Sequence, residues 1–369
     1  MIKTISKENA ITAYKGFKDD FSCLDFQYEV GMEYHINGDL EMCENGFHAC
    51  EKPIDVFDYY NMSPYTRYAI VELWGDVVYA CDKKKLCASC IKIVKELSLK
   101  EMITLAIRMS EKDSSLTNEY DECKDKSFAS DKDGEKMSSY VDSALISSSG
   151  DRSSLKSCGY LQSVSSSGSH VNIDVSSAST SVSSSGISYK IVSDGSGSKI
   201  SGSGYGGNIL SIGEHSNIAT SGFDTTIVSR GGYGSIASAD SSNIFSSGFA
   251  SSMYASSVGS TIASIGDAAK ISMNSIFGYI NSIGRDATIM SSGLNSRIDS
   301  SGENALIMCS GEGTSAKAKK GSWITLTEWK NEGDKMYPVC VKTEYVDGKK
   351  IKADTWYQLK KGKFIEVDM

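Results

Sequence analysis

The sequence is poor in several residue types, and each shortage limits what the protein can be. Only 3 of its 369 residues are Pro, and aromatic residues make up 9% of the chain. No run of 18 apolar residues occurs, so we expect no membrane-spanning helix. The first 17 residues contain no apolar segment of the kind found in secretory signal peptides. We therefore expect a cytoplasmic protein that does not act at a membrane.

Basic residues are also scarce relative to acidic ones. The chain carries 38 Lys and Arg against 46 Asp and Glu, which gives a formal net charge of −8. Contact with nucleic-acid phosphates needs clustered Lys and Arg, so this balance argues against a nucleic-acid partner. Residues 147–315 carry 11 acidic and 8 basic side chains, too even a mixture to imitate a nucleic acid.

Ten Cys residues are present, and without an export signal they are predicted to be free thiols in a reducing compartment. The shortest spacing is the sequence CASC at residues 87–90, with Cys43, His48, Cys50 and Cys81 in the same region. A structural zinc site needs two such pairs at regular spacing. Thiols in or near a small core are the simpler interpretation, with zinc binding and a redox pair as alternatives. Neither a metal nor a cofactor is predicted.

Glycine, by contrast, is abundant and ordered. Of the 34 Gly, 15 fall into one nine-residue register of 19 positions, in which Ser177, Asp240, Ser257 and Ser275 replace Gly and one residue is lost before position 248. A fixed period of this kind indicates a repeat architecture. The first part of the series consists of Gly150, Gly159, Gly168, Gly186, Gly195, Gly204, Gly213 and Gly222.

An apolar side chain follows each repeat glycine by five residues. This column includes Ile191, Ile200, Ile209, Ile218, Ile227 and Ile236, and it continues through Phe245 and Met253. The residues two before and two after are small, most often Ser, and those between are mainly polar. This alternation predicts a short strand with one buried face, and the glycine is expected to supply a turn where a positive φ costs little.

Each nonapeptide is therefore predicted to be one strand and one corner, and stacked units bury what a single unit cannot. We expect a mainly β fold, a nonapeptide-repeat β-solenoid. Two repeats per 18-residue coil are favoured over three. With strands ~4.8 Å apart, roughly ten coils would form a rod about 45–50 Å long. Inward-facing Ser is expected to fit a narrow core and to hydrogen-bond a corner.

The composition changes along the chain and divides it into four segments. Residues 1–97 are rich in aromatic and charged residues and are predicted to form a small α+β head. Residues 98–127 open with a capping box, Ser98 and Glu101, and should form a helix and a charged hinge. Residues 128–319 form the solenoid, and residues 320–369 are predicted to be a C-terminal β-meander that caps it.

Few residues suggest a binding or catalytic site. Tyr160, Tyr205, Phe223 and Phe249 each follow a repeat glycine directly, on a turn that should be exposed, and are candidates for partner contacts. The repeats lack the Asp that the calcium-binding nonapeptide motif requires. No Ser-His-Asp set can be assembled, because the histidines of the repeats have no fixed acidic partner.

Several motifs resemble an uncharacterised protein family common in phages and prophages of gut bacteria. They are FQYEVG at residues 26–31, CENGFHAC at 43–50, DVFDYY at 55–60 and KGSWITL at 320–326, together with the nonapeptides. The resemblance covers nearly the whole chain. It implies a phage-encoded or prophage-encoded cytoplasmic protein and carries no established activity.

Residues 10–80 also resemble, more weakly, the ADP-ribosyltransferase fold. Tyr14-Lys15-Gly16 is similar to the first-strand motif of that family, and residues 46–49 are similar to its next motif. The resemblance puts Lys15 in place of the ribose-binding His and His48 in place of the nicotinamide-stacking Tyr. Glu72 stands in the strand that would follow. Without a carboxylate that orients the ribose, the transition state loses support, so an inactive or repurposed relative is expected.

Three functions follow as hypotheses. The first is a non-catalytic interaction protein whose solenoid binds a host protein, for example one of a defence system that the phage disarms. The second is a transferase that acts on NAD⁺ and a host target through the head. The third is a structural rod of a virion or cell surface, which would form a homo-oligomer.

Overall fold

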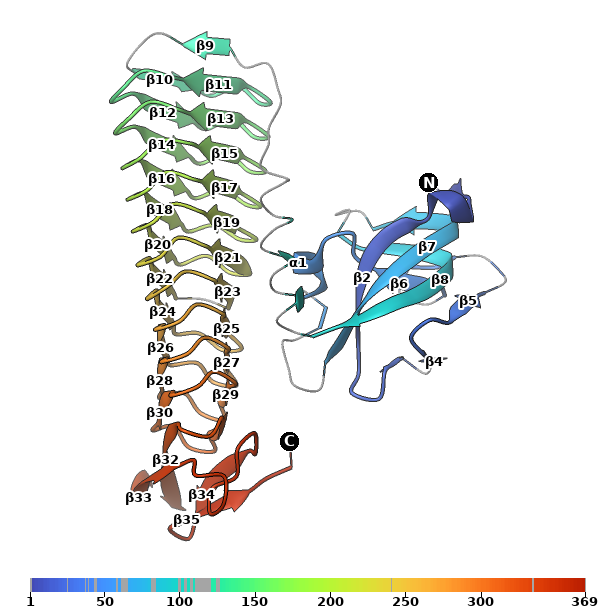
Figure 1. Ribbon diagram of the computed structural model, residues 1–369. Coiled ribbons are helices and arrows are strands. Elements are labelled where there is room, and N and C mark those ends of the chain that lie inside the picture. Colours follow the sequence, from blue (N-terminus) through green and yellow to red (C-terminus); the bar gives the residue numbers. More distant parts are fainter. Residues whose placement is uncertain are drawn as a thin grey trace. The chain divides into compact units, whose positions relative to one another are not determined.

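The computed structural model describes residues 2–368 apart from residues 25, 37, 39, 43, 44, 58, 61–65, 81–83, 99, 100, 103, 104, 107, 108, 110–120, 124–126, 240 and 334. The chain divides into two compact units, unit 1 with residues 1–115 and unit 2 with residues 116–369 (Figure 1). About 51% of the residues lie in strands and 4% in helices, which confirms the predicted mainly β class. The finer boundaries predicted within these units stay a prediction.

Unit 1 is built on a six-stranded antiparallel sheet. Its order is β1-β7-β8-β5, with β2 paired to β7 and β6 paired to β8. A backbone bridge between Tyr14 and Cys50 also joins β2 to the end of β6, so the sheet closes on itself. The strands are β1 (Lys3–Ile5), β2 (Ile11–Phe17), β5 (Glu33–His35), β6 (Phe47–Ala49), β7 (Arg67–Tyr79) and β8 (Leu86–Leu97).

The interior of this closed sheet follows the alternation of the sequence. Ala13 on β2 pairs with Val71 on β7, and both face a core that includes Phe17, Leu73 and Ile91. The described helical elements before residue 98 are short, namely η1 (Lys7–Asn9) and α1 (Pro53–Val56), so this part contains less helix than the term α+β suggests. Two small strands, β3 (Ser22–Cys23) and β4 (Phe26–Gln27), pair with each other.

The capping box predicted at residue 98 is present. The backbone N–H of Glu101 donates to Ser98 Oγ at 3.2 Å, and the N–H of Ser98 donates to Glu101 Oε2 at 2.8 Å. Residues 101, 102, 105, 106 and 109 are helical, and Met102 and Ala106 are buried. Ile103 and Ile107, two further apolar residues of this segment, lie outside the described residues.

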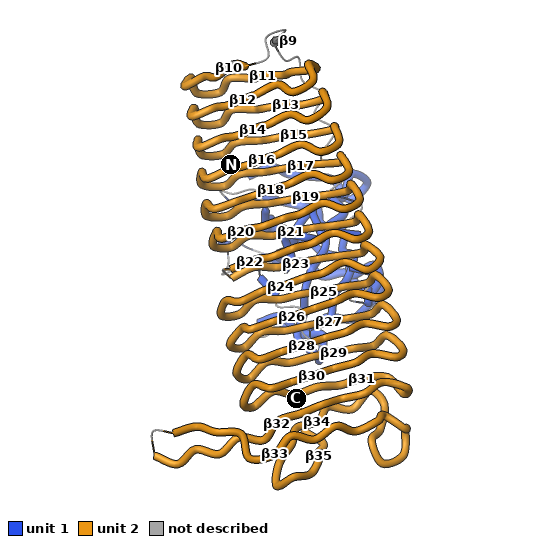
Figure 2. Tube along the Cα trace, turned by 90° about the vertical axis from the view of Figure 1, so that its left-hand side faces the viewer, with its two compact units in different colours: residues 1–115 blue, residues 116–369 orange. Residues whose placement is uncertain are grey.

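Unit 2 is a solenoid in which each strand between residues 121 and 309 pairs in parallel with the strand two further along the chain (Figure 2). The first solenoid sheet contains β10 (Ser127–Ser130), β12 (Leu145–Ser148), β14 (Ser163–Ser166), β16 (Ser181–Ser184), β18 (Lys199–Gly202), β20 (Asn217–Thr220), β22 (Ser235–Ser238), β24 (Ser252–Ala255), β26 (Lys270–Met273), β28 (Thr288–Ser291) and β30 (Leu306–Cys309). The second contains β9 (Asp121–Cys123), β11 (Lys136–Ser139), β13 (Ser154–Ser157), β15 (Asn172–Val175), β17 (Lys190–Ser193), β19 (Asn208–Ser211), β21 (Thr225–Ser229), β23 (Ser242–Ser246), β25 (Thr261–Ser264), β27 (Tyr279–Ser282), β29 (Arg297–Ser300) and β31 (Ser315–Ala318).

The strand register confirms two repeats per coil. Ile200 pairs with Ile218 in the first solenoid sheet, and Ile191 pairs with Ile209 in the second, each a step of 18 residues. About 11 turns span residues 129 to 325. The predicted Ile column fills the space between the sheets, since Ile191, Ile200, Ile209, Ile218, Ile227 and Ile236 are at most 2% exposed.

The reason predicted for the repeat glycines is wrong. None of them has a positive φ; the left-handed residue lies two positions later and is usually not glycine, for example His170 at 59° and Asp224 at 51°. Glycine allows successive coils to approach closely there, and Ser occupies the same position only at residues 177, 257 and 275. A Cβ on Gly204 would lie 1.8 Å from the carbonyl oxygen of Gly186 in the preceding coil, and the same clash recurs at Gly150, Gly159, Gly168, Gly186, Gly195, Gly213 and Gly222 against the backbone of the coil before.

The position expected for Phe245 is also wrong. Ile244 pairs with Ile227 and fills the core, whereas Phe245 pairs with Val228 on the face turned away from the coil interior. The lost residue therefore lies between Ile236 and Ile244, before Phe245 rather than after it. Because side chains alternate with a period of two, a shift of one residue exchanges the two faces.

The C-terminal cap closes both sheets. In the first sheet, β32 (Trp323–Glu332) continues the parallel stack and then pairs antiparallel with β33 (Lys335–Tyr345). In the second, β34 (Tyr357–Lys360) pairs antiparallel with β31 through Ala316 and Tyr357 and then with β35 (Lys363–Glu366). Lys317 on β31 pairs with Asp299 at 2.7 Å and lies 5.1 Å from the Trp356 ring centre, which ties the cap to the last coils.

Candidate functional site

A pocket of about 200 Å³ lies in unit 1 where β2 and β6 approach each other. It contains the two residues, Lys15 and His48, that sequence reasoning placed at a possible catalytic site. Its described lining consists of Tyr14, Lys15, Gly16, Cys23, Leu24, His48, Ala49, Cys50, Val56, Tyr59, Tyr60 and Lys85. Unit 1 therefore has one small site built from residues far apart in the sequence.

Lys15 is a buried cation at this pocket. It lies on β2 opposite Ala69, on the core side of the sheet, and its side chain is only 3% exposed. Its Nζ donates to the carbonyl oxygen of His48 at 2.9 Å and contacts Cys23 Sγ at 3.4 Å. Burial lowers the pKa of Lys15. Among the described residues no carboxylate forms an ion pair with it.

Tyr60 and Cys23 complete this wall of the pocket. The Tyr60 hydroxyl lies 2.9 Å from Cys23 Sγ, and its ring packs directly against Gly16. A Cβ on Gly16 would come within 2.4 Å of the ring, so glycine is required for this contact. Cys23 and Tyr60 were not among the sequence candidates. Cys23 lies on β3, where the chain turns back after β2, and Tyr60 follows α1.

His48 on β6 is held in its neutral form. Burial, followed by the positive charges of Lys15 and Lys85, lowers its pKa to about 4. The pocket therefore has a positive electrostatic environment in a protein whose net charge is −8.

Glu72, the third catalytic candidate, does not line this pocket. It pairs with Thr12, whereas Lys15 pairs with Ala69, so the two side chains lie on opposite faces of the β2–β7 pair. The structure thus brings Lys15 and His48 together and leaves Glu72 apart. The alternation along β2 and β7 explains this, since residues 69 and 72 are an odd number apart.

The four aromatic candidates of the solenoid divide between its two edges. Tyr205 and Phe223 lie on turns that lead from the first sheet to the second, and Tyr160 and Phe249 lie on the turns that lead back. All four are exposed, at 51–56%. The N–H of Ser188 donates to the Tyr205 carbonyl, so these turns are stacked one upon another.

Further apolar residues share the edge of Tyr205 and Phe223. We call this set the hydrophobic edge. It occupies six of seven successive coils, interrupted at Ser241, and its first five members are 39–56% exposed. At ~4.8 Å per coil the row is about 29 Å long. Its members are Ile187, Tyr205, Phe223, Val258, Ile276 and Leu294.

The opposite edge carries a shorter aromatic cluster. The rings of His215 and Tyr233 stack with centres 5.3 Å apart, and Tyr233 meets Phe249 edge-on at 5.6 Å. Tyr160 lies several coils away from this cluster. Sequence reasoning found single aromatic residues here, but the clusters are visible only once the 18-residue coil is known.

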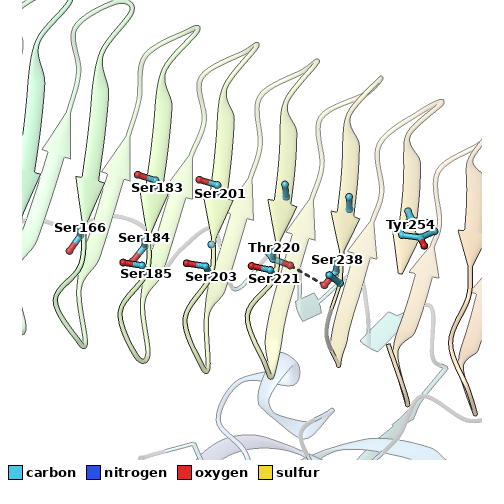
Figure 3. A pocket seen from close by; sticks show the side chains of 14 residues that line it. Ser166, Ser183, Ser184, Ser185, Ser201, Ser203, Thr220, Ser221, Ser238 and Tyr254 are labelled. Atoms are coloured by element: carbon cyan, nitrogen blue, oxygen red, sulfur yellow. Dashed lines mark hydrogen bonds between the residues drawn. The ribbon is translucent and has the colours of Figure 1, made fainter. Parts of the chain in front are cut away.

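A shallow groove lined by small residues runs over the first solenoid sheet (Figure 3). Its volume is about 370 Å³, and Ser183, Ser201, Ala219 and Ala237 succeed one another along it until Tyr254 ends the row. A hydrogen bond of 2.9 Å joins Thr220 on one coil to Ser238 on the next. The described lining of the groove offers hydroxyl groups from Ser, Thr and Tyr side chains and contains no charged residue.

The cysteines give no metal site among the described residues. No group of three metal-ligating side chains occurs there, and Cys23, Cys50, Cys87, Cys90, Cys158, Cys309 and Cys340 are free thiols, as predicted. Residues 87 and 90 are three apart on strand β8, so they point to opposite faces. The candidates Cys43 and Cys81 lie outside the described residues. No described helix is long and apolar enough to cross a membrane.

Comparison with known proteins found a match only for the N-terminal part of the chain. Residues 11–105 match the model of a domain of unknown function, DUF7666. This range includes strands β2 to β8 and the pocket residues Lys15, His48 and Lys85. No curated protein matches the chain. No solved structure matches it either. In this chain, a segment similar to that domain of unknown function thus precedes a β-solenoid.

Proposed function

We propose that the protein is a non-catalytic interaction protein whose solenoid binds a host protein through the hydrophobic edge. One observation carries the proposal: five apolar side chains of this row are at least 39% exposed, on five of six successive coils of the solenoid. Contiguous exposed apolar surface of this kind marks interaction sites. Repeat proteins present such surfaces because each coil adds one contact at a fixed spacing.

Tyr205 and Phe223 are the expected anchors of this contact. Aromatic side chains dominate binding energies at interfaces, and these two are adjacent in the row. Ile187 lies on the coil before Tyr205 and Val258 lies two coils after Phe223, and both would help to exclude water. The charged residues nearby, such as Asp224, fit the polar rim of an interface.

The test compares matched variants of the two edges. Full-length protein with Tyr205→Ala and Phe223→Ala, and a control with Tyr160→Ala and Phe249→Ala, are used to capture partners from a lysate of the host. We expect a protein retained by the wild type and the control to be lost with the first variant. Equal capture by both variants, or no capture at all, would contradict the proposal.

The proposal has three further parts: the protein is encoded by a phage or prophage, it acts in the host cytoplasm, and it disarms a host defence system. Its support is the resemblance of residues 26–31, 43–50, 55–60 and 320–326 to a phage family. Expression of the chain in a host that carries defence systems should raise phage plating on that host, and the Tyr205→Ala, Phe223→Ala variant should not.

A transferase acting on NAD⁺ is the second candidate. The observation in its favour is that Lys15 and His48 line one pocket. Incubation with labelled NAD⁺ and host lysate should give label transfer that His48→Ala or Lys15→Ala abolishes. Absence of transfer removes this candidate. A structural rod, the third hypothesis, predicts a stable homo-oligomer in analytical ultracentrifugation and is excluded by a monomer.

A further inference from the structure

We propose that the pocket of unit 1 binds a small organic anion, with its carboxylate or phosphate group beside Lys15 and Lys85 and its body against the tyrosine rings. This site is independent of the solenoid edge. A failure of one proposal therefore leaves the other untouched.

The charges that line the pocket are all of one sign. Lys15, His48 and Lys85 are its titratable basic groups, and none of its described lining residues is Asp or Glu. This is unusual in a chain with more acidic than basic residues. A concentration of like charge in a cleft attracts ligands of the opposite charge.

Lys15 supplies the strongest reason for a ligand. Lys15 is only 3% exposed, yet among the described residues its hydrogen-bond partners are a carbonyl oxygen and a thiol, and its Nζ otherwise lies over the rings of Phe17 and Tyr28, at 5.5 and 5.6 Å from their centres. Removing an ammonium group from water without a counter-ion costs several kcal/mol. An anion in the pocket would restore this interaction and hold Lys15 in its charged form.

The rest of the lining fits the body of an organic anion. Tyr14, Tyr59 and Tyr60 present aromatic surface, and Lys85 Nζ lies 4.5 Å from the ring centre of Tyr59. Tyr59 is 42% exposed, so the pocket reaches the surface beside Lys85. An anion can thus meet Lys85 at the entrance and Lys15 at the inner end.

His48 reports on the charge inside the pocket. Its neighbours are Lys15 from β2, Lys85 before β8, and the thiols of Cys87, its strand partner, and Cys50. Burial and the two lysines lower the pKa of His48 to about 4. A bound anion opposes the two lysine charges and therefore raises the pKa of His48. At pH values between the free and the bound pKa of His48, binding is then accompanied by proton uptake. For a ligand that remains anionic, affinity is therefore expected to rise as the pH falls through about 5 towards 4.

The experiment follows the His48 imidazole by NMR in the full chain, with inorganic phosphate and benzoate as probes. Each probe is added over the pH range 3.5–8. We expect the pKa of His48 to rise by about one unit with at least one probe. A response to phosphate alone identifies the oxyanion as the recognised group, and a response to benzoate alone shows that the aromatic body is required. No change with either probe contradicts the proposal.

Three variants separate a local site from general electrostatics. Lys85→Gln should weaken binding about tenfold, and Lys15→Met should abolish the shift of His48. Lys3→Gln on β1 removes the same charge outside the pocket and should bind like the wild type. If Lys15→Met does not fold, Lys85→Gln and Lys3→Gln decide alone. Equal loss in both, or unchanged binding in Lys85→Gln, overturns the proposal.

Discussion

The repeat glycines recur along the rod because successive coils are in contact at this position, not because the turn needs them. In each coil the glycine Cα faces the carbonyl oxygen of the residue 18 positions earlier, as Gly204 faces Gly186. The turn itself tolerates side chains, because Ala250 and Ala268 occupy its left-handed position at φ 52° and 57°. The two positions therefore make different demands on the sequence.

A substitution at each position tests this difference. Gly204→Ala should destabilise the solenoid by about 4 kcal/mol or more, since its Cβ would lie 1.8 Å from a backbone oxygen. Gly259→Ala has no atom within 4 Å of the new Cβ and should cost only about 1 kcal/mol, for its φ of 73°. Thermal unfolding followed by circular dichroism compares the two. Similar melting temperatures would contradict the stacking explanation.

The inward-facing serines are of two kinds. Ser216 Oγ donates to the Gly213 carbonyl at 2.9 Å and so fastens a corner, as predicted, and Ser153 and Ser198 do the same in their coils. Ser264 is equally buried, but its Oγ has no hydrogen-bond partner among the described residues. Only the first kind is expected to stabilise the fold through its hydroxyl.

Alanine substitutions distinguish the two kinds. Ser216→Ala should cost about 1 kcal/mol, because it leaves the Gly213 carbonyl without its donor. Ser264→Ala should be neutral or stabilising, since it removes an unsatisfied buried hydroxyl. Melting temperatures of the two variants give the comparison. A larger loss for Ser264→Ala would show that its hydroxyl has a role that the hydrogen bonds do not reveal.

At the scale of the coil, one large side chain is accommodated by glycines around it. Tyr189 occupies a corner position that is small in most coils, and it is fully buried. Cβ atoms on Gly202 and Gly207 would lie 1.9 and 2.1 Å from its side chain. The three residues therefore form one packing unit across neighbouring strands.

A double-mutant cycle measures this coupling. Gly202→Ser alone should destabilise the solenoid by about 3 kcal/mol through overpacking. Combined with Tyr189→Ser, which restores the small residue found in other coils, it should cost far less than the sum of the single changes. Chemical denaturation of the four proteins gives the coupling energy. Additive effects would show that Tyr189 and Gly202 do not share space.

The strand register of the solenoid is the part of this fold that the sequence predicts best. A single Ile every nine residues defines the buried face, and the length of the repeat limits the coil to a few sizes. Phe245 shows the limit of this reasoning. Ile244 and Phe245 are adjacent and both apolar, so the sequence does not show whether the residue is lost before or after them, and either one could fill the core. The glycine clash was not predictable either, since it depends on the distance between stacked backbones.

The candidate sites were predictable only in part, for the same reason. Tyr205 and Phe223 stand out as aromatic residues on turns, but Ile187 and Val258 join them only when positions 18 apart are stacked. In unit 1, Lys15 and His48 could be named through a resemblance. Cys23, Tyr60 and Lys85 could not, because they lie on β3, after α1 and before β8, and no local sequence pattern shows that these segments meet at one pocket.

For the whole molecule, the coil of 18 residues is the unit that can be removed. Deletion of residues 279–296 takes out β27 and β28 and leaves every later strand in its own sheet. We expect a folded protein whose melting temperature falls by about 5 °C or less, because each coil contacts only its neighbours. Circular dichroism and thermal unfolding test this.

Deletion of a single nonapeptide is the control. Removing residues 279–287 takes out β27 alone and moves each later strand to the opposite sheet, so that β32 and β34 of the cap would have to exchange places. We expect aggregation or a much larger fall in melting temperature, since the cap no longer covers the matching strand ends. Equal behaviour of the two deletions would contradict the role assigned to the cap.

The 18-residue coil also makes the rod a molecular ruler. Duplication or loss of one coil changes the spacing between its ends by ~4.8 Å while the register on both sides stays intact. Reach can therefore be adjusted in small equal steps by copying 54 nucleotides of coding sequence in frame. The same event lengthens the hydrophobic edge by one side chain, so the length of the rod and the extent of its contact surface are inherited together.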